Sequence, residues 1–328
     1  MAAPIPADAP VTIATLPIGA EGSGVHNGPA AVRLIDSRIT DVIPSARKSE
    51  ACDPRGPRRP LPLTLASLRL SSEPSKGSFT MDLRIQRAVV ANLRTRPNAA
   101  ESGPFVLGLD HGTDSPHINY ATPVPGAEIT AADVDALVAA FGARPPRLEY
   151  VTSCAPGLEK LLLGAGLAVE ARNEYLICTP ETLVATSVPA GFELFAPKTD
   201  DEIAGVIAVQ NEAFGSPGDA GPADLDRQRG VARRGAVFVG ARTADGRYAG
   251  GGGTVVPSDG ICEVGGIAVG AAHRNRGLAG AITAEIAGRL FESGVEVAWL
   301  EAGGDDSWRV YERVGFRPAG QRLYIARY

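Results

Sequence analysis

The hydrophobic pattern of the chain becomes regular from residue 81 onward. Apolar positions there recur with a period of two in some segments and at helical spacing in others. Strands are predicted at 104–110, 148–153 and 261–269, and helices at 130–142 and 279–291. Such an alternation of strands and helices is typical of an α/β layered domain.

Residues 1–80 have a different composition. They are dense in Pro, Gly and Ser and show no sustained period of 2 or 3.6, so we expect a disordered tail that buries little apolar surface. The only methionines are Met1 and Met81, and Met81 opens the first helical pattern. One hypothesis is that natural translation starts at Met81; a translated but disordered extension is the alternative.

The regular part contains an internal repeat. An offset of 149 residues places Gly166 on Gly315, and the same offset aligns both the strand at 148–153 with 297–302 and the helix at 130–142 with 279–291. One register that holds through helix and strand indicates a duplication, with copies at 81–190 and 191–328. Tyr311 is matched by Leu162, and "RNRGLA" is matched by "PGAEIT". We therefore expect the chemistry in the second copy.

Composition excludes several classes of protein. The 328 residues are 44% hydrophobic and 21% charged, as in a soluble globular protein, and the net charge of −5 argues against a nucleic-acid partner. No run approaches the roughly 18 apolar residues of a membrane span, and no basic signal-peptide start is present.

Cysteine and histidine positions do not suggest a metal site or a disulfide framework. Cys52, Cys154, Cys178 and Cys262 are widely and irregularly spaced, without a C-x-x-C pair. We expect buried thiols in a reducing cytoplasm and no bound metal. The glycine run 249–256 lacks the lysine and helix of a phosphate loop, so it predicts a bulge or an open floor for substrate.

The segment "HRNRGLAGAIT" at 273–283 carries the most specific chemistry. It lies where a strand pattern gives way to a helix pattern, and the unpaired N–H groups of a helix start bind phosphate-type anions. Gly277 and Ala279 keep side chains away from such an anion, while Arg274 and Arg276 add positive charge. The preceding strand could pair with an amide-bearing arm. A ligand with a diphosphate and a peptide-like arm is coenzyme A.

At these residues the chain resembles the GNAT superfamily of acyl-CoA-dependent N-acyltransferases. The family signature [QR]-x-x-G-x-[GA] is met by Arg274, Gly277 and Ala279, and its YEKxGF motif appears as "YERVGF" at 311–316. The resemblance covers 192–328, and the first copy looks like a degenerate GNAT half, as in tandem GNAT proteins. It implies a mixed, mostly antiparallel sheet flanked by helices, and direct acetyl transfer from acetyl-CoA to an amine.

The resemblance also implies residue roles. Tyr311 occupies the position of the general acid, and Glu263 one where some members place a general base; a packed aromatic and an exposed strand carboxylate are the respective alternatives. The residues implied to hold the cofactor are Ile267, Ala268, Val269, Arg274, Asn275, Arg276, Gly277, Leu278, Ala279 and Gly280. Many members carry Asn where this chain has Gly304, and Ser307 is a candidate replacement.

The acceptor cannot be read from the sequence. We expect a primary amine on a small molecule or peptide; a non-catalytic acyl-CoA-binding or scaffold protein is the rival, and synthesis of a thiol such as mycothiol is a weaker third idea. His273 could contact a phosphate, although a solvated loop histidine is favoured. The oligomeric state is left open, a homodimer included.

Overall fold

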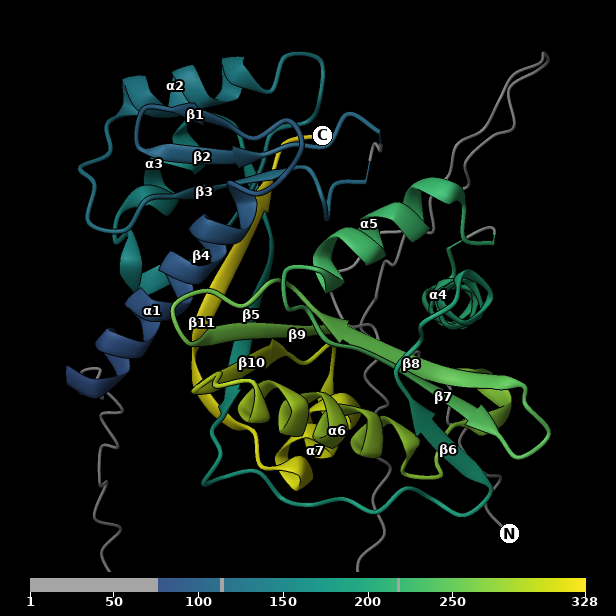
Figure 1. Ribbon diagram of the computed structural model, residues 1–328. Coiled ribbons are helices and arrows are strands. Elements are labelled where there is room, and N and C mark those ends of the chain that lie inside the picture. The colour runs from purple at the N-terminus through teal and green to yellow at the C-terminus, as the bar shows by residue number, and fades with distance from the viewer. Residues whose placement is uncertain (1–75, 113–114, 217–218) are drawn as a thin grey trace, which may run out of the picture. The chain divides into compact units, whose positions relative to one another are not determined.

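One mixed sheet runs through the part of the chain that the structure describes (Figure 1). This computed structural model describes residues 76–328 except 113–114 and 217–218, so most of the expected tail lies outside the described residues. The helices are α1 (Lys76–Leu93), α2 (Ala131–Ala140), α3 (Leu158–Gly164), α4 (Asp200–Phe214), α5 (Pro222–Ala232), α6 (Leu278–Glu292) and α7 (Asp305–Val314). The strands are β1 (Ala100–Ser102), β2 (Phe105–Gly108), β3 (Tyr120–Pro123), β4 (Arg147–Val151), β5 (Ala168–Cys178), β6 (Phe192–Phe195), β7 (Phe238–Thr243), β8 (Tyr248–Thr254), β9 (Ile261–Val269), β10 (Val297–Glu301) and β11 (Arg317–Ala326).

The two halves contribute a similar series of strands to the sheet, one on each side of its centre. The strand order is β1-β2-β3-β4-β11-β5-β10-β9-β8-β7-β6, and every described neighbouring pair is antiparallel except β3 with β4 and β9 with β10. The run β3-α2-β4-α3-β5 of the first half therefore corresponds to β9-α6-β10-α7-β11 of the second. Two tandem halves with a mixed sheet were predicted from the sequence, and this fold confirms them.

The two halves exchange their last strands. β11, which ends the second half, lies between β4 and β5, and it pairs Leu323 with Tyr150 of β4. β5, which ends the first half, pairs Cys178 with Ala298 of β10. Figure 1 shows yellow β11 among teal strands of the first half. Each half thus completes the sheet of the other, and the predicted boundary at residue 190 stays a prediction.

A buried ionic network joins the halves where the strands exchange. The Arg322 guanidinium, 1% exposed, donates to Glu301 of β10 and to Glu149 of β4, the latter at 3.2 Å. The Tyr324 hydroxyl also donates to Glu301, at 2.5 Å. Because an uncompensated buried charge is costly, these partners depend on one another.

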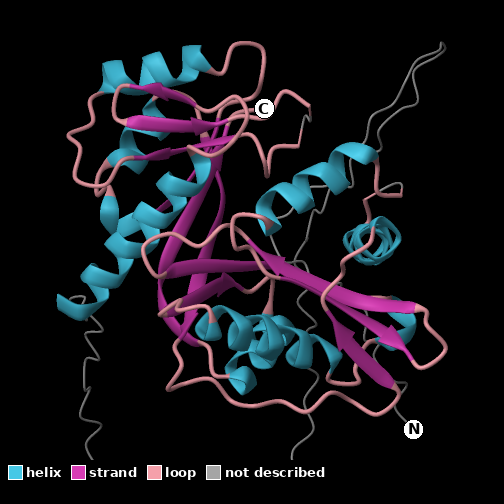
Figure 2. Cartoon of the chain, in the orientation of Figure 1, coloured by secondary structure: helices cyan, strands magenta, loops and turns pink. Residues whose placement is uncertain are grey.

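Helices cover both faces of the second half (Figure 2). A Cβ atom on Gly251 of β8 would lie 2.3 Å from Val206 of α4, and one on Gly252 would lie 2.3 Å from Ile267 and 3.0 Å from Ile286 of α6. The glycine run in β8 is therefore needed for close packing on both faces. The expected open floor was wrong, although a register shift does occur in β8 opposite β9.

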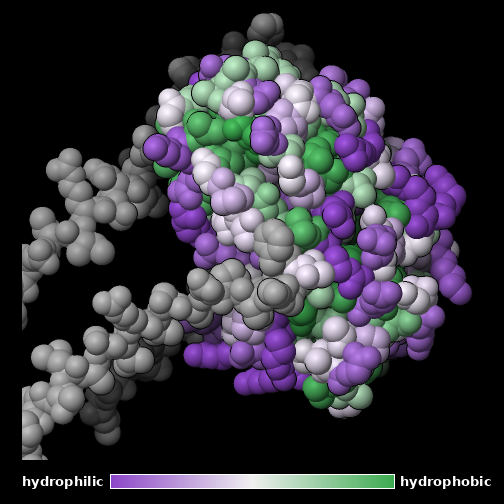
Figure 3. Space-filling view, turned by 90° about the vertical axis from the view of Figure 1, so that its left-hand side faces the viewer, coloured by the Kyte–Doolittle hydropathy of each residue, from purple (hydrophilic) through white to green (hydrophobic). Residues whose placement is uncertain are grey.

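The surface of the described residues is chemically mixed where Figure 3 shows it. Hydrophilic and hydrophobic residues are interspersed on that face. No helix within the described ranges is both long enough and apolar enough to cross a membrane.

Candidate active site

The site begins where two parallel strands part. β10 pairs with β9 only from Ile261 to Glu263, and then continues beside β5 as far as Glu301. From Val264 to Val269, that edge of β9 has no strand neighbour among the described residues. Unpaired backbone groups on such an edge can bind an extended amide-bearing ligand as they would bind a neighbouring strand.

A β-bulge shapes this free edge. Gly266 has φ of +63°, and the pairing with β8 shifts register between Gly251 and Gly253. The bulge changes which face the side chains point to, so that Ile267 joins Val264 in the core beneath α6. Gln210 of α4, 3% exposed, holds the bulge by donating from Nε2 to the Gly266 carbonyl at 2.7 Å.

The start of α6 has no side-chain cap. Asn275 and Gly277 take left-handed conformations, with φ of +61° and +82°, and no side chain caps the N–H groups of the first turn. The first helical hydrogen bond runs from the Ala281 N–H to the Gly277 carbonyl at 3.1 Å. The preceding N–H groups are thus available to an anion.

The matching helix of the first half is closed by its own side chains. The Thr130 hydroxyl accepts from the Asp133 N–H, and the Asp133 carboxylate accepts from the Thr130 N–H, which forms a capping box. Hydrogen bonds from Thr130 hold the pKa of Asp133 below its ordinary value. The Asp133 carboxylate at this helix start repels anions. The first half therefore lacks the anion site that the second half offers at the start of α6.

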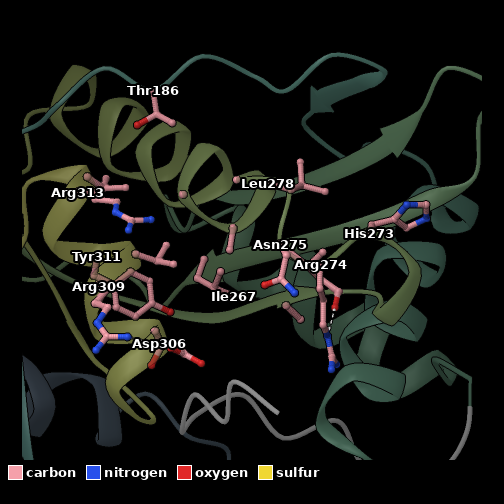
Figure 4. A pocket seen from close by; sticks show the side chains of 18 of the residues that line it. Thr186, Ile267, His273, Arg274, Asn275, Leu278, Asp306, Arg309, Tyr311 and Arg313 are labelled. Carbon is pink, nitrogen blue, oxygen red and sulfur yellow. Dashed lines mark hydrogen bonds and ion pairs between the residues drawn. The ribbon is translucent and has the colours of Figure 1, made fainter. Parts of the chain in front are cut away.

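The uncapped helix and the free strand edge open into one cleft of about 710 Å³ (Figure 4). Two of the predicted site residues, Glu263 and Arg276, do not line this cleft. The Arg276 guanidinium lies instead over the Phe192 ring, 5.9 Å from its centroid. The predicted residues that do line it are Ile267, Ala268, Val269, Arg274, Asn275, Gly277, Leu278, Ala279, Gly280 and Tyr311. Arg274 also donates from Nε to the Val269 carbonyl at 3.1 Å, which ties the loop to the strand end.

Tyr311 of α7 is a buried residue that brings its hydroxyl to the cleft. The residue is 1% exposed, and its ring packs against Phe316 with 6.2 Å between centroids. The hydroxyl has no hydrogen-bond partner among the described residues, and Figure 4 shows it directed into the cleft. Burial raises the pKa of Tyr311, so the phenol stays protonated at neutral pH and can donate a proton.

Glu263 lies on the opposite face of the sheet from Tyr311. Its neighbours along β9, Cys262 and Val264, belong to the core beneath α6 that also contains Tyr311. Glu263, partly buried, points to the other face, where its β10 partner Trp299 packs in a separate core.

Two arginines on α7 were missed by the sequence analysis. Arg309 and Arg313, four residues apart, line the cleft and an adjoining hollow that Arg317 also lines. Arg309 pairs with Asp306 at 3.4 Å, whereas Arg313 has no ion-pair partner in the described part of the chain. Their helical spacing around Tyr311 was a readable signal.

Other predictions at the site had mixed outcomes. His273 is not a solvated loop histidine: it lines the cleft, its ring meets Phe192 edge-on at 5.5 Å, and Nδ1 is buried without a partner among the described residues. Ser307 also lines the cleft, and its hydroxyl donates to the Gly304 carbonyl at 2.8 Å. The described residues contain no group of three or more His, Cys, Asp or Glu that could hold a metal.

Comparisons with known proteins agree with this geometry. The sequence model of the acetyltransferase (GNAT) family matches residues 203–316. A solved GCN5-related N-acetyltransferase from Kribbella flavida is 26% identical, with a TM-score of 0.62, over 75% of this chain and 95% of that one. A GCN5-related N-acetyltransferase from Sphaerobacter thermophilus is 17% identical over 56% and 59% of the two chains, with a TM-score of 0.47.

A further structural match has a tandem organisation. It is a tandem GNAT protein from the clavulanic acid biosynthesis pathway, 16% identical over 76% of this chain and 95% of that one, with a TM-score of 0.48. A search of curated protein sequences found no match. Residues 203–316, which carry the strand opening, the uncapped helix and Tyr311, form a domain of the GNAT acetyltransferase family.

Proposed function

We propose that the protein is an N-acetyltransferase that moves an acetyl group from acetyl-CoA to a primary amine of a small molecule or peptide. The observation that carries the proposal is one cleft that joins an uncapped helix start, a free strand edge and the hydroxyl of Tyr311. These three features fit the diphosphate, the amide-bearing arm and the thioester of one donor molecule. Buried free thiols at Cys154, Cys178 and Cys262 fit a reducing compartment, so we propose a cytoplasmic location.

In this proposal the donor is held mainly by backbone. N–H groups from Asn275 to Gly280 bind the diphosphate, and the free edge at Ile267–Val269 pairs with the amides of the arm. Arg309 and Arg313 add charge at the outer part of the cleft. A ligand with several negative charges is favoured there because the acidic Asp306 offsets only one of the two arginines.

The two residues proposed to move protons, Glu263 and Tyr311, lie on opposite faces of the sheet. An amine with a pKa near 10 must lose a proton before it attacks, and Glu263 is proposed to accept that proton, directly or through water. The amine nitrogen bonds to the acyl carbon as the carbon–sulfur bond breaks. Tyr311 is proposed to give its proton to the departing sulfur and to regain one from solvent.

The test is a screen of amines, aminoglycosides and peptides with acetyl-CoA, with released thiol as the readout. With an active acceptor, Tyr311→Phe should keep CoA affinity and lose turnover by about 10²-fold or more. Tyr150→Phe is the matched control, because Tyr150 is equally buried but packs in the first half. An unchanged rate in Tyr311→Phe would remove Tyr311 from the mechanism.

The pH dependence adds a second readout. The phenol pKa is raised above its ordinary value of 10.0, so a rate that depends on the protonated phenol should not fall until the pH exceeds 10. A protein that binds CoA but releases no thiol with any amine would instead be an acyl-CoA-binding protein.

A further inference from the structure

The segment that connects the two halves runs along the mouth of the cleft. It leaves β5 at Cys178 and reaches β6 at Phe192, and Thr186 in its middle lines the cleft (Figure 4). The first half has lost its own anion site, yet this segment brings it into contact with the site of the second half.

One end of the segment is fixed to the end of α7. The Val184 N–H donates to the Val314 carbonyl at 2.9 Å. Gly315, with φ of +109°, ends the helix against the segment so closely that a Cβ atom there would lie 1.9 Å from the Thr182 carbonyl oxygen. The segment is therefore built onto the helix that carries Tyr311.

The other end reaches the start of α6. Pro189 Cγ lies 3.9 Å from the position that a Cβ atom on Gly277 would take. Phe192, directly after the segment, lies beneath the Arg276 guanidinium and against the ring of His273. The segment thus spans the cleft mouth from the end of one helix to the start of the other.

Apolar side chains flank Thr186 without being covered. Val184 and Val188 are 47% and 42% exposed, which is unusual among the large hydrophobic side chains of the described residues. Of residues 184–189 only Thr186 lines the cleft itself, but exposed apolar groups beside a cleft are a common mark of a ligand contact. Two valines and a threonine are suited to contact a flat, partly apolar ring of a ligand.

We propose that residues 184–189 form a wall of the cofactor cleft and bind the adenosine half of the acyl-CoA donor. This inference rests on the proposed function. Pro189 approaches Gly277, so the segment passes the helix start proposed to hold the diphosphate, to which the adenosine half is joined. Arg309 and Arg313 on α7 also line the cleft, and they would supply positive charge for the 3′-phosphate of that half.

The test is CoA titration by calorimetry with the full chain and a Val184→Ser/Val188→Ser double variant. The variant should bind CoA about tenfold more weakly, since covering the exposed half of two valines is worth about one decade of affinity. Leu163→Ser is the matched control, because Leu163 is also 47% exposed but lies on α3 of the first half; it should leave CoA affinity unchanged.

A fragment of the cofactor separates a local contact from a general loss of fold. Adenosine 3′,5′-bisphosphate should displace CoA from the unaltered protein and should lose affinity in the double variant by the same factor as CoA. Saturating CoA should also slow amide hydrogen exchange at 184–189. Equal CoA affinity in the variant, no displacement by the bisphosphate, or unchanged exchange would each overturn the inference. Absence of CoA binding to the unaltered protein would refute the proposed function itself.

Discussion

Gln210 links the fold to the chemistry most directly, and Gln210→Met tests that link. Methionine has nearly the same length and volume but cannot donate a hydrogen bond. Gln210 is 3% exposed and is held 2.7 Å from the Gly266 carbonyl, so the substitution removes one buried hydrogen bond without opening a cavity. The perturbation is confined to the bulge that leads into the free edge of β9.

The expected loss of stability follows from the burial of both Gln210 and the Gly266 carbonyl. A buried carbonyl left without a donor costs about 1–3 kcal/mol, and each kcal/mol lowers the melting temperature of a chain this long by about 2–4 °C. The start of α6 is not touched, so CoA affinity should change by less than about threefold. The rate should fall by up to about 10²-fold, because the backbone after Gly266 no longer holds the thioester in register.

Thermal unfolding, CoA calorimetry and thiol release with an active amine measure these three effects. Gln228→Met is the matched control, since Gln228 is only partly buried on α5, and it should leave all three unchanged. A Gln210→Met protein that loses stability but keeps its full rate would refute the idea that the bulge positions the donor.

Three further predictions concern the fold. Gly315→Ala should lower the free energy of unfolding, measured by chemical denaturation, by at least about 2 kcal/mol, because the new Cβ would meet the Thr182 carbonyl. Gly294→Ala is the control: Gly294 also has a positive φ but has free space around it, so this change should cost about 1 kcal/mol. Arg322→Met should cost about 3 kcal/mol, because it removes the buried cation that Glu301 and Glu149 share, although Arg147 still pairs with Glu149 and the Tyr324 hydroxyl still donates to Glu301; Arg242→Met, which breaks a partly exposed ion pair, should cost under about 1 kcal/mol. Thr130→Ala should lower stability more at pH 7 than in acid. The folded-state pKa of Asp133 lies below its ordinary 3.8, so the bond from the Thr130 hydroxyl to this carboxylate contributes above that pH and is lost as the pH falls through the folded value, whereas the bond from the Asp133 N–H to the hydroxyl does not titrate; acid titrations of both proteins measure the difference.

Local patterns predicted the parts of the fold that depend on neighbouring residues. The helix predicted at 130–142 occurs as α2, which Thr130 caps, and the strand and helix around Gly277 occur where the apolar spacing placed them. The expectation of buried thiols holds for the cysteines that the structure describes, Cys154, Cys178 and Cys262. Each of these features depends on residues within one or two turns of chain.

The exchange of β5 and β11 could not be predicted, because an apolar strand carries no mark of which strand it will join. The path of 184–189 was equally hidden, since its side chains follow no period. Gln210 left a signal that the sequence analysis did not use: it continues the apolar spacing of Ile203, Val206 and Ile207 on α4 as a polar residue in a buried position. A polar residue on a core face requires a partner, and here the partner is the bulge.

The central claim is that the uncapped start of α6 binds the diphosphate of a thioester donor. Calorimetry of CoA with the pure, folded chain tests it most directly. The account predicts saturable binding of one CoA per chain that weakens as salt is raised, because charge contributes to it. No detectable heat at millimolar CoA would contradict the account and the transferase assignment with it.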